Sequence, residues 1–167
     1  MQELQIINNK NPWPKGWGQK TSIMGVINLT PDSFSDGGDL NSPKKVLYQV
    51  NQFLRNGVDI VDLGAQSTRP GAEEVGSNIE IKRLIPYLKL IKSEYPEILI
   101  SIDTFNSEVA YEALLNGANW INDVTGGRRD KEILNVVSEF NCPFVITHSR
   151  GSSQNMNELS KYKNVLS

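Results

Sequence analysis

Short apolar runs alternate with helix-like segments along most of this chain, and this alternation limits the folds that it can adopt. The apolar runs cover residues 23–28, 58–63, 98–102, 118–121 and 144–147. Their shortness and the turn residues around them predict buried strands rather than helices. Segments with helical periodicity lie between them and predict helices over 43–56, from 77 through 91, over 107–116 and over 130–140, with a fifth from about 155.

Particular residues indicate where these helices begin and bend. Ser42 and Pro43 suit the start of the first helix. Ser77 and Glu80 have the spacing of a capping box, and Pro86 predicts a kink or break in the second helix. The predicted apolar face of the first helix comprises Val46, Val50, Phe53 and Leu54. That of the fourth comprises Ile133, Leu134, Val137 and Phe140.

Alternating strands and helices predict parallel strands joined by right-handed crossovers. Two segments repeat this unit visibly: NGVDIVD at 56–62 and NGANWIN at 116–122 each read as a helix end, a Gly, a strand and a final Asp or Asn. The order fits an α/β fold of one of two kinds, the first five units of a TIM-type (β/α)8 barrel or an open doubly wound sheet. The G-x-G-x-x-G turn that favours a dinucleotide-binding sheet does not follow the first strand.

Polar residues follow every predicted strand. They comprise Asn28 with its long loop and the segments 62–71, 101–104, 122–127 and 147–151. In parallel α/β folds the carboxyl ends of the strands share one face, and ligands bind there. Any one of these clusters could equally be a helix cap or a turn. Five clusters at the same face predict a ligand site.

The side chains at this face indicate a ligand with an anionic end and a polar ring. Asn28 offers a side-chain oxygen, a hard ligand that suits Mg²⁺. Asp103 and Asn122 offer hydrogen-bonding groups that suit an N–H-rich heteroaromatic ring. Two hydroxyls and a guanidinium that suit a phosphate come from Ser67, Thr68 and Arg69.

Composition argues against several other classes of protein. The 167 residues include 17 Lys and Arg against 19 Asp and Glu, with a net charge of −2 and no basic stripe, so no nucleic-acid partner is expected. Arg128 and Arg129 follow two glycines and are expected on a solvated turn. No apolar stretch approaches the ~18 residues of a membrane span, and the first residues show no signal-peptide pattern.

The single cysteine, Cys142, suits a reducing compartment and predicts a cytoplasmic protein. Its apolar surroundings predict a buried structural thiol rather than a nucleophile. Residues 1–20 are expected to form an arm in which Trp13 and Trp17 pack on the body, and residues 21–167 to form one domain.

Four segments resemble the motifs of the dihydropteroate synthase family in order and spacing. They read MGVINLTPDSFSDGG, DIVDLGAQSTRPGAEEV, SIDT and GANWINDVTGG, and the resemblance covers residues 23–151. It implies a TIM-type (β/α)8 barrel and a transferase of folate biosynthesis. In the implied reaction, p-aminobenzoate displaces pyrophosphate from 6-hydroxymethyl-7,8-dihydropterin diphosphate, with Mg²⁺ as the cofactor.

The resemblance also implies how the substrates are held. The loop after the first strand would close over the site and place Pro31 and Phe34 against the ring of p-aminobenzoate. Asn28, at the base of that loop, would help hold Mg²⁺ and the diphosphate. Thr68 and Arg69 would contact the diphosphate.

Two of the implied site residues would be catalytic. Arg69 would stabilise the departing pyrophosphate, and Asp103 would stabilise the cation that develops at the pterin methylene. Asp103 and Asn122 would together hold the pterin ring. The implied reaction needs no activated protein nucleophile.

The sequence departs from the family pattern at several places. It has Gly-Ala-Gln at 64–66 where many relatives have Gly-Gly-Glu, which is taken as tolerated variation. His148 stands in Thr-His-Ser where the family shows Met-His-Met, and packing at the strand end is favoured over a role as general base. A barrel of this type needs roughly 250 residues. The domain is therefore expected to be incomplete at its C-terminus and inactive alone, and the full-length protein to be a homodimer.

Two other interpretations fit the same residues. A methyltetrahydrofolate:corrinoid methyltransferase would share the pterin-holding Asp103 and Asn122 but would need no diphosphate site. An inert fragment that only interacts with a complementary half would need no catalysis at all. The motifs TPDSFSDGG and STRPG argue for the synthase over the methyltransferase.

Overall fold

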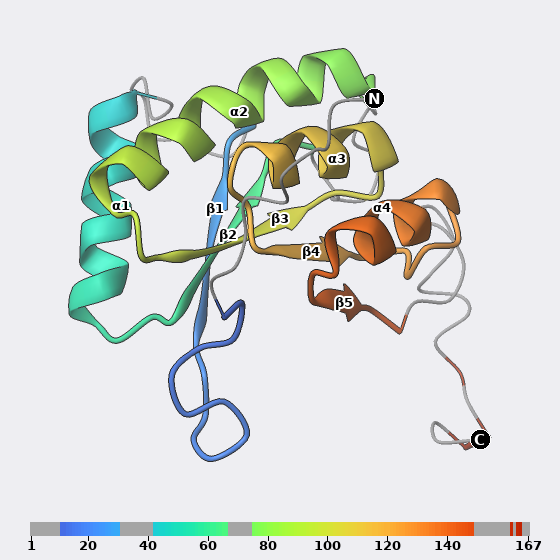
Figure 1. The fold of residues 1–167 in the computed structure, drawn as a ribbon, viewed down its shortest axis with the longest axis horizontal. Helices are drawn as coiled ribbons and strands as arrows, with labels where there is room; N and C mark the ends of the chain where they lie inside the picture. The colour runs from blue at the N-terminus through green and yellow to red at the C-terminus, as the bar shows by residue number, and fades with distance from the viewer. Residues whose placement is uncertain (1–10, 31–41, 67–74, 149–160, 162, 165–167) are drawn as a thin grey trace.

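The structure is a computed structural model that describes residues 11–30, 42–66, 75–148, 161 and 163–164. Five strands alternate with four helices (Figure 1). The strands are β1 (Met24–Asn28), β2 (Ile60–Gly64), β3 (Leu99–Asp103), β4 (Trp120–Asp123) and β5 (Phe144–Ile146). The helices are α1 (Pro43–Arg55), α2 (Ser77–Glu94), α3 (Ser107–Leu115) and α4 (Glu132–Phe140).

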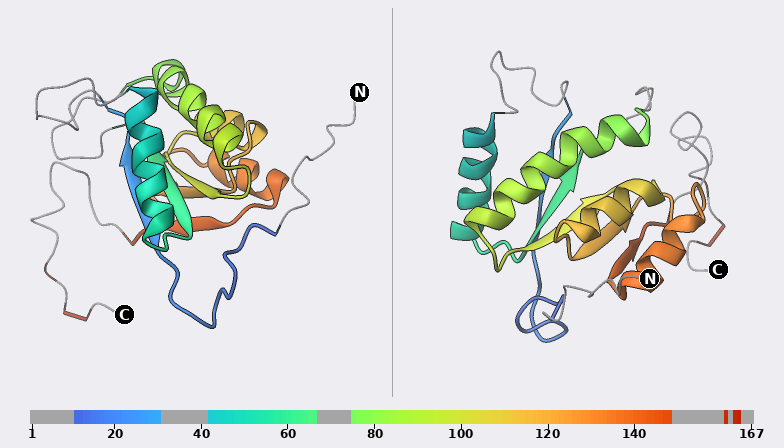
Figure 2. Two further views of the ribbon diagram at one scale, coloured as in Figure 1. Left: turned by 90° about the vertical axis from the view of Figure 1, so that its left-hand side faces the viewer. Right: turned by 45° about the horizontal axis from the view of Figure 1, so that its top comes forward.

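The five strands form one parallel sheet in the order β1-β2-β3-β4-β5. The four helices lie along one side of this sheet, as Figure 2 shows from two further directions. An open doubly wound sheet places helices on both faces and reverses its strand order near the middle. Sequential order with helices on one side is instead the arrangement of consecutive units of a parallel barrel, so the predicted barrel is confirmed over the doubly wound sheet.

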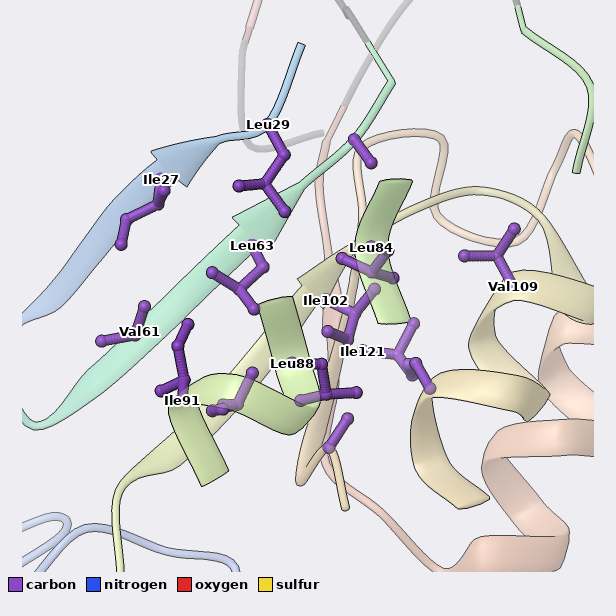
Figure 3. Close-up of a cluster of buried hydrophobic side chains, with 14 of the residues drawn as sticks. Ile27, Leu29, Val61, Leu63, Leu84, Leu88, Ile91, Ile102, Val109 and Ile121 are labelled. Carbon is purple, nitrogen blue, oxygen red and sulfur yellow. The ribbon is translucent and has the colours of Figure 1, made fainter. Parts of the chain in front are cut away.

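The hydrophobic core lies between the sheet and the helices (Figure 3). Alternate strand residues face it, because successive side chains of a strand point to opposite faces. These include Ile27, Leu63, Ile102 and Ile121, each at most 1% exposed. From α2, Leu84, Leu88 and Ile91 complete the layer at a spacing of three or four residues.

The structure confirms some details of the predicted helix ends and contradicts others. Helix α2 takes Gly76 as its N-cap, and the Ser77 hydroxyl donates to Glu108 Oε2 at 2.6 Å, so Ser77 and Glu80 form no capping box. The helix continues without a break through Pro86, whose exposed position leaves the freed carbonyl of the preceding turn open to water. Ser42 is the N-cap of α1, but its side chain makes no capping hydrogen bond.

Two residues of the predicted apolar faces are also exposed. Leu54 of α1 is 37% exposed and Leu134 of α4 is 47% exposed, whereas Val46, Val50 and Ile133 are buried. A helix has room for only one stripe against the sheet, so a neighbour one position along the chain turns away from the core.

The repeated segments noted in the sequence form the same local structure twice. Asp59 Oδ2 accepts from the backbone N–H of Ile23, and Asn119 Oδ1 accepts from that of Ile100, both at 3.0 Å. A lysine supports each acceptor: Lys20 Nζ lies 3.0 Å from Asp59 Oδ1, and Lys92 Nζ lies 2.8 Å from Asn119 Oδ1. We call these two arrangements the strand clamps. Each one ties the start of a strand to the approach of the next strand.

The described part of the arm, residues 11–20, lies at the amino ends of the strands (Figure 1). Trp13 and Trp17 pack on Trp120, the first residue of β4, with ring centroids 5.0 and 5.3 Å away. Trp120 is 5% exposed, and its indole N–H donates to the carbonyl of Pro12. The prediction that these tryptophans pack on the body is confirmed. Among the described residues, no helix combines the length and the apolar character that crossing a membrane requires.

Candidate functional site

The register of the sheet brings three predicted site residues into one row. Asn28 of β1 pairs with Gly64 of β2, Gly64 pairs with Asp103 of β3, and Asp103 pairs with Asn122 of β4. All four lie at or next to the carboxyl end of their strands. Their neighbours in sequence, such as Ile102 and Ile121, face the helices, so this row lies on the opposite face of the sheet. We call it the polar row.

Gly64 is the point of closest approach within the polar row. A Cβ atom built on Gly64 would lie 3.3 Å from Asn28 Oδ1 and 3.4 Å from Asp103 Oδ2. A larger residue here would therefore press on both side chains. The absence of a side chain at Gly64 leaves the amide oxygen and the carboxylate free to act on the same ligand.

A second layer of side chains lies on the same face of the sheet, two residues closer to the amino ends of the strands than the polar row. It contains Val26, Asp62, Ser101 and Trp120, which are paired across the four strands. Asp62 Oδ2 accepts a hydrogen bond at 3.1 Å from Asn122 Nδ2, so the two layers are connected. From the sequence, Asp62 is only one member of the polar cluster at 62–71, with no role of its own. The alternation of side chains could have identified it, because Asp62 has the same parity as Gly64.

The pKa of Asp103 is raised to about 7, first by burial and then by the negative charges of Asp62, Glu80 and Asp123. Burial likewise raises the pKa of Asp62, although the nearby Ser101 hydroxyl and the hydrogen bond from Asn122 oppose the change. Several carboxyl groups therefore lie close together at the site. A ligand that donates hydrogen bonds or carries positive charge would stabilise their ionised forms. Strongly perturbed carboxyl groups of this kind are typical of functional sites.

The loop after β4 is shaped by Asp123, which is fully buried. Its two oxygens accept from the backbone N–H groups of Thr125 at 2.7 Å and Gly127 at 2.6 Å. Gly127 has φ = 74°, a left-handed conformation that favours glycine. Asp123 is therefore a structural residue that holds this loop beside the polar row.

The exit of β3 is held from the helix side. Glu80, in the first turn of α2, is 2% exposed, and burial raises its pKa despite the opposing hydrogen bond with Thr104 and the charge of Arg83. Thr104 follows Asp103 directly, and its backbone N–H donates to the carbonyl of Asn122 at 3.1 Å. These contacts fix the backbone on either side of Asp103.

Five of the predicted site residues lie outside the described residues. They are Pro31 and Phe34 of the first loop, and Ser67, Thr68 and Arg69 of the second. The phosphate-binding and p-aminobenzoate-binding parts of the site remain predictions from the sequence. The described stem of the second loop includes Gln66, whose side-chain oxygen accepts from the backbone N–H of Val75 at 2.8 Å and so connects the two sides of that loop.

Three further predictions concern single residues near the strand exits. His148 is exposed near the end of β5, and its predicted packing role stays a prediction. Arg128 and Arg129 are exposed as predicted, and Arg129 lies over the ring of Phe105 with 4.4 Å to the centroid. Burial raises the pKa of Cys142 to about 11, which keeps the thiol protonated and agrees with a structural role.

Asn28 fits a role as a ligand to Mg²⁺ in part. Its side chain lies at the carboxyl end of β1 with Oδ1 directed toward Gly64, on the same face as Asp103. Among the residues that the structure describes, no group of three or more His, Cys, Asp or Glu side chains could hold a metal ion. Mg²⁺ commonly takes one or two protein oxygens and completes its shell with water and substrate phosphates. A single amide oxygen beside a phosphate site suits that arrangement.

The fold and the site together define a parallel α/β barrel protein with a polar ligand site at the carboxyl ends of its strands. The model of the pterin binding enzyme family matches residues 24–167. The chain belongs to this family.

Proteins of known sequence and structure agree with this assignment. The chain is 50% identical to the folate synthesis bifunctional protein of Arabidopsis thaliana over 81% of its own length and 28% of that protein. It is 43% identical to the dihydropteroate synthase of Synechocystis over 90% of its length and 52% of the relative. It thus spans about half or less of these relatives.

Two solved structures show how the fold compares. The dihydropteroate synthase of Clostridium difficile, determined in the presence of pteroic acid, has a TM-score of 0.76 and 41% identity over 88% of this chain and 53% of that one. The enzyme of Xanthomonas albilineans with 4-aminobenzoic acid has a TM-score of 0.69 and 36% identity over 86% and 50%. The barrel fold that the sequence predicts is confirmed.

Proposed function

We propose that this chain forms the pterin-binding part of a dihydropteroate synthase, in which p-aminobenzoate displaces pyrophosphate from 6-hydroxymethyl-7,8-dihydropterin diphosphate. The observation that carries the proposal is the register of β1 to β4, which aligns Asn28, Asp103 and Asn122 on one face beside Gly64. The relatives named dihydropteroate synthase support the reaction. The structures with pteroic acid and 4-aminobenzoic acid support the substrate class.

In this proposal the described residues hold the pterin and stabilise the charge that develops on it. Asn122 and Asp103 hydrogen-bond the ring. The bond between the pterin methylene carbon and the phosphate oxygen breaks, and pyrophosphate leaves with the electron pair. Ionised Asp103 stabilises the electron-poor methylene, the amine nitrogen of p-aminobenzoate bonds to that carbon, and the amine loses a proton.

The phosphate end of the substrate belongs to the loops after β1 and β2. Thr68 and Arg69 would bind the diphosphate, with Ser67 beside them, and Arg69 would stabilise the leaving group. Pro31 and Phe34 would contact the ring of p-aminobenzoate. Bound Mg²⁺ would neutralise charge on the leaving pyrophosphate, and Asn28 would supply one of its oxygen ligands.

Calorimetric titration of the purified chain tests the proposed function. We expect 6-hydroxymethyl-7,8-dihydropterin to bind, and pyrophosphate with Mg²⁺ to tighten that binding, because the synthase site holds both groups together. A methyltransferase-like protein would bind the pterin with no response to pyrophosphate. An interaction-only fragment would bind neither ligand, and this result would contradict the proposal. Asp59→Asn, at the far end of β2, serves as the control variant for ligand binding.

A side chain at Gly64 is expected to weaken binding of the pterin. Gly64→Val would place branched carbon atoms between Asn28 Oδ1 and Asp103 Oδ2, where even a Cβ would lie within 3.4 Å of both. We expect the affinity for the pterin to fall ~10-fold or more through loss of aligned hydrogen bonds, and Gly64→Ala to have a smaller effect.

The control for Gly64 is Gly76→Ala, because an added Cβ at Gly76 meets no atom within 4 Å. Circular dichroism would establish that each variant is folded before titration. Unchanged pterin affinity in folded Gly64→Val would contradict the placement of the ligand over the polar row.

The location and the assembly state of the protein are part of the same proposal. The single cysteine of the chain suits a reducing compartment, which we take to be the cytoplasm. For the full-length protein we propose a homodimer.

A further inference from the structure

We propose that Asp62 is a positioning residue for the pterin site: it fixes the side-chain amide of Asn122 in one orientation, and so sets which hydrogen-bonding groups Asn122 presents to the ring. The inference rests on the proposed function for its ligand, although the positioning itself is a property of the ligand-free chain.

The contact reaches across a whole strand. Asp62 belongs to β2 and Asn122 to β4, with β3 between them. Asp62 is paired with Ser101 of β3, and Asn122 is paired with Asp103 two residues further along that strand. The 3.1 Å hydrogen bond from Asn122 Nδ2 to Asp62 Oδ2 therefore runs diagonally over β3, from the upper layer to the lower one.

An ionised carboxylate determines which way the amide turns. A carboxylate only accepts hydrogen bonds, whereas an asparagine amide has one donor end and one acceptor end. Turning the Asn122 amide around would place its carbonyl oxygen against the Asp62 oxygen, with loss of the bond and repulsion between two acceptors. With Nδ2 held toward the lower layer, Asn122 Oδ1 is left to accept from an N–H group of the ring.

The remaining contacts of Asp62 do not explain it as a structural residue. Asp62 is 3% exposed and Ser101 is fully buried, yet Asp62 Oδ1 and Ser101 Oγ have no hydrogen-bond partner of good geometry among the described residues. Buried polar atoms in a folded protein are normally paired, and an unpaired one costs stability. Ser101 lies close enough to act on the pKa of Asp62, but the well-formed side-chain hydrogen bond of this buried carboxylate goes to a site residue, Asn122. A carboxylate retained at that cost is better explained by the site than by the fold.

Side-chain amide exchange measured by NMR tests the positioning directly. In the ¹⁵N-labelled chain, the Nδ2 signals of Asn122 are identified by their loss in Asn122→Ala. We expect Asp62→Ala to speed the exchange of the bonded proton ~10-fold, which corresponds to loss of one charged hydrogen bond. Asp62→Asn keeps a carbonyl acceptor and is expected to restore slow exchange in part. If Asp62→Ala does not fold, Asp62→Asn decides, since faster exchange supports the inference and unchanged exchange overturns it.

The ligand arm of the experiment separates this inference from the proposed function. Titration with 6-hydroxymethyl-7,8-dihydropterin is expected to show ~10-fold weaker binding in Asp62→Ala than in the unmodified chain. If the unmodified chain does not bind the pterin, the proposed function fails while amide exchange still decides the role of Asp62. If the pterin binds equally well to both chains, or Asn122 exchanges equally in both, the inference is overturned.

Asp59→Ala is the matched control for both arms. It removes the same kind of side chain from the residue directly before β2, but the partners of Asp59 are the Ile23 N–H and Lys20 at the amino end of the sheet. We expect it to lower stability and to leave both the Asn122 exchange rate and the pterin affinity unchanged. Equal effects of Asp59→Ala and Asp62→Ala on the Asn122 signals would indicate general loosening of the sheet, and would overturn the specific role of Asp62.

Discussion

Asp103→Asn makes the folded chain more stable at pH 8 and at the same time removes most of its affinity for the pterin; this is the result that we expect from the electrostatics of the polar row. The folded pKa of Asp103 is about 7, against 3.8 for an ordinary Asp, because the group is buried near Asp62, Glu80 and Asp123. Between these two values the folded chain keeps a proton that the unfolded chain has lost. Stability therefore falls as the pH rises from about 4 to 7.

Replacing the carboxyl group by an amide removes this loss. The rise in the pKa of Asp103 from 3.8 to about 7 corresponds to about 4 kcal/mol as an upper limit. Partial access to solvent and coupling between the carboxyl groups reduce it, so we expect Asp103→Asn to gain about 1–3 kcal/mol at pH 8 and little at pH 4. Urea denaturation at the two pH values measures the difference.

Asp59→Asn provides a control of opposite sign. Hydrogen bonds from the Ile23 N–H and Lys20 lower the pKa of Asp59, so its carboxylate stabilises the fold above its ordinary pKa. Asp59→Asn should therefore lose stability at pH 8. If Asp103→Asn also lost stability at pH 8, the raised pKa of Asp103 would be wrong.

Binding distinguishes the functional role of Asp103 from its cost to stability. The carboxylate accepts hydrogen bonds from ring N–H groups, and removing a charged partner of this kind lowers affinity by about 10- to 100-fold. Calorimetric titration with 6-hydroxymethyl-7,8-dihydropterin would measure this. A variant that is more stable and binds the pterin as well as before would exclude Asp103 from the site.

Trp120→Ala is the second large effect, expected as a loss of about 3–5 kcal/mol in the free energy of unfolding. Trp120 is 5% exposed, lies against Trp13 and Trp17, and donates to the Pro12 carbonyl. Truncation would leave a cavity in the second layer, of which Trp120 is part, and would remove the contacts that hold the arm on the sheet. Urea denaturation followed by circular dichroism avoids the change in fluorescence that the loss of a tryptophan brings.

Two further variants divide this loss into its parts. Trp120→Phe keeps an aromatic ring but loses the N–H donor, and we expect it to cost about 1 kcal/mol. Tyr48→Ala removes an aromatic side chain that is 67% exposed, and it should change stability by about 0.5 kcal/mol or less. A loss below about 1 kcal/mol for Trp120→Ala would show that the arm contributes little to the fold.

The sequence predicted the order of the elements and the face on which the site lies, because both follow from hydrophobic periodicity and from the geometry of parallel sheets. It placed the strand ends less well. The strands β2 to β4 end one or two residues later than predicted, at Gly64, Asp103 and Asp123. Backbone hydrogen bonding continues through polar residues when neighbouring strands are available, whereas hydropathy marks only the apolar part of a strand.

Hydropathy, which marks only the apolar part of a strand, also gives no sign of a role for Asp62. Asp62 is one residue from Leu63, which faces the core, and two residues from Gly64, which faces the site. Only the alternation of side chains along the strand shows that Asp62 shares the face of Gly64. The repeat in the sequence contained the missing information, because it aligns Asp62 with Asn122. The loops that carry Pro31, Phe34, Thr68 and Arg69 lie outside the described residues, so their roles remain predictions.

The two strand clamps have a consequence for how the sheet is put together. Each clamp consists of a lysine, an acidic or amide side chain and one backbone N–H, and the two acceptors, Asp59 and Asn119, are 60 residues apart. The sheet thus contains two similar pairs of strands, β1 with β2 and β3 with β4, and each pair has its own strand clamp at its amino end. A substitution that breaks the hydrogen bonds of one strand clamp leaves those of the other in place. This is the behaviour expected of a repeated structural unit.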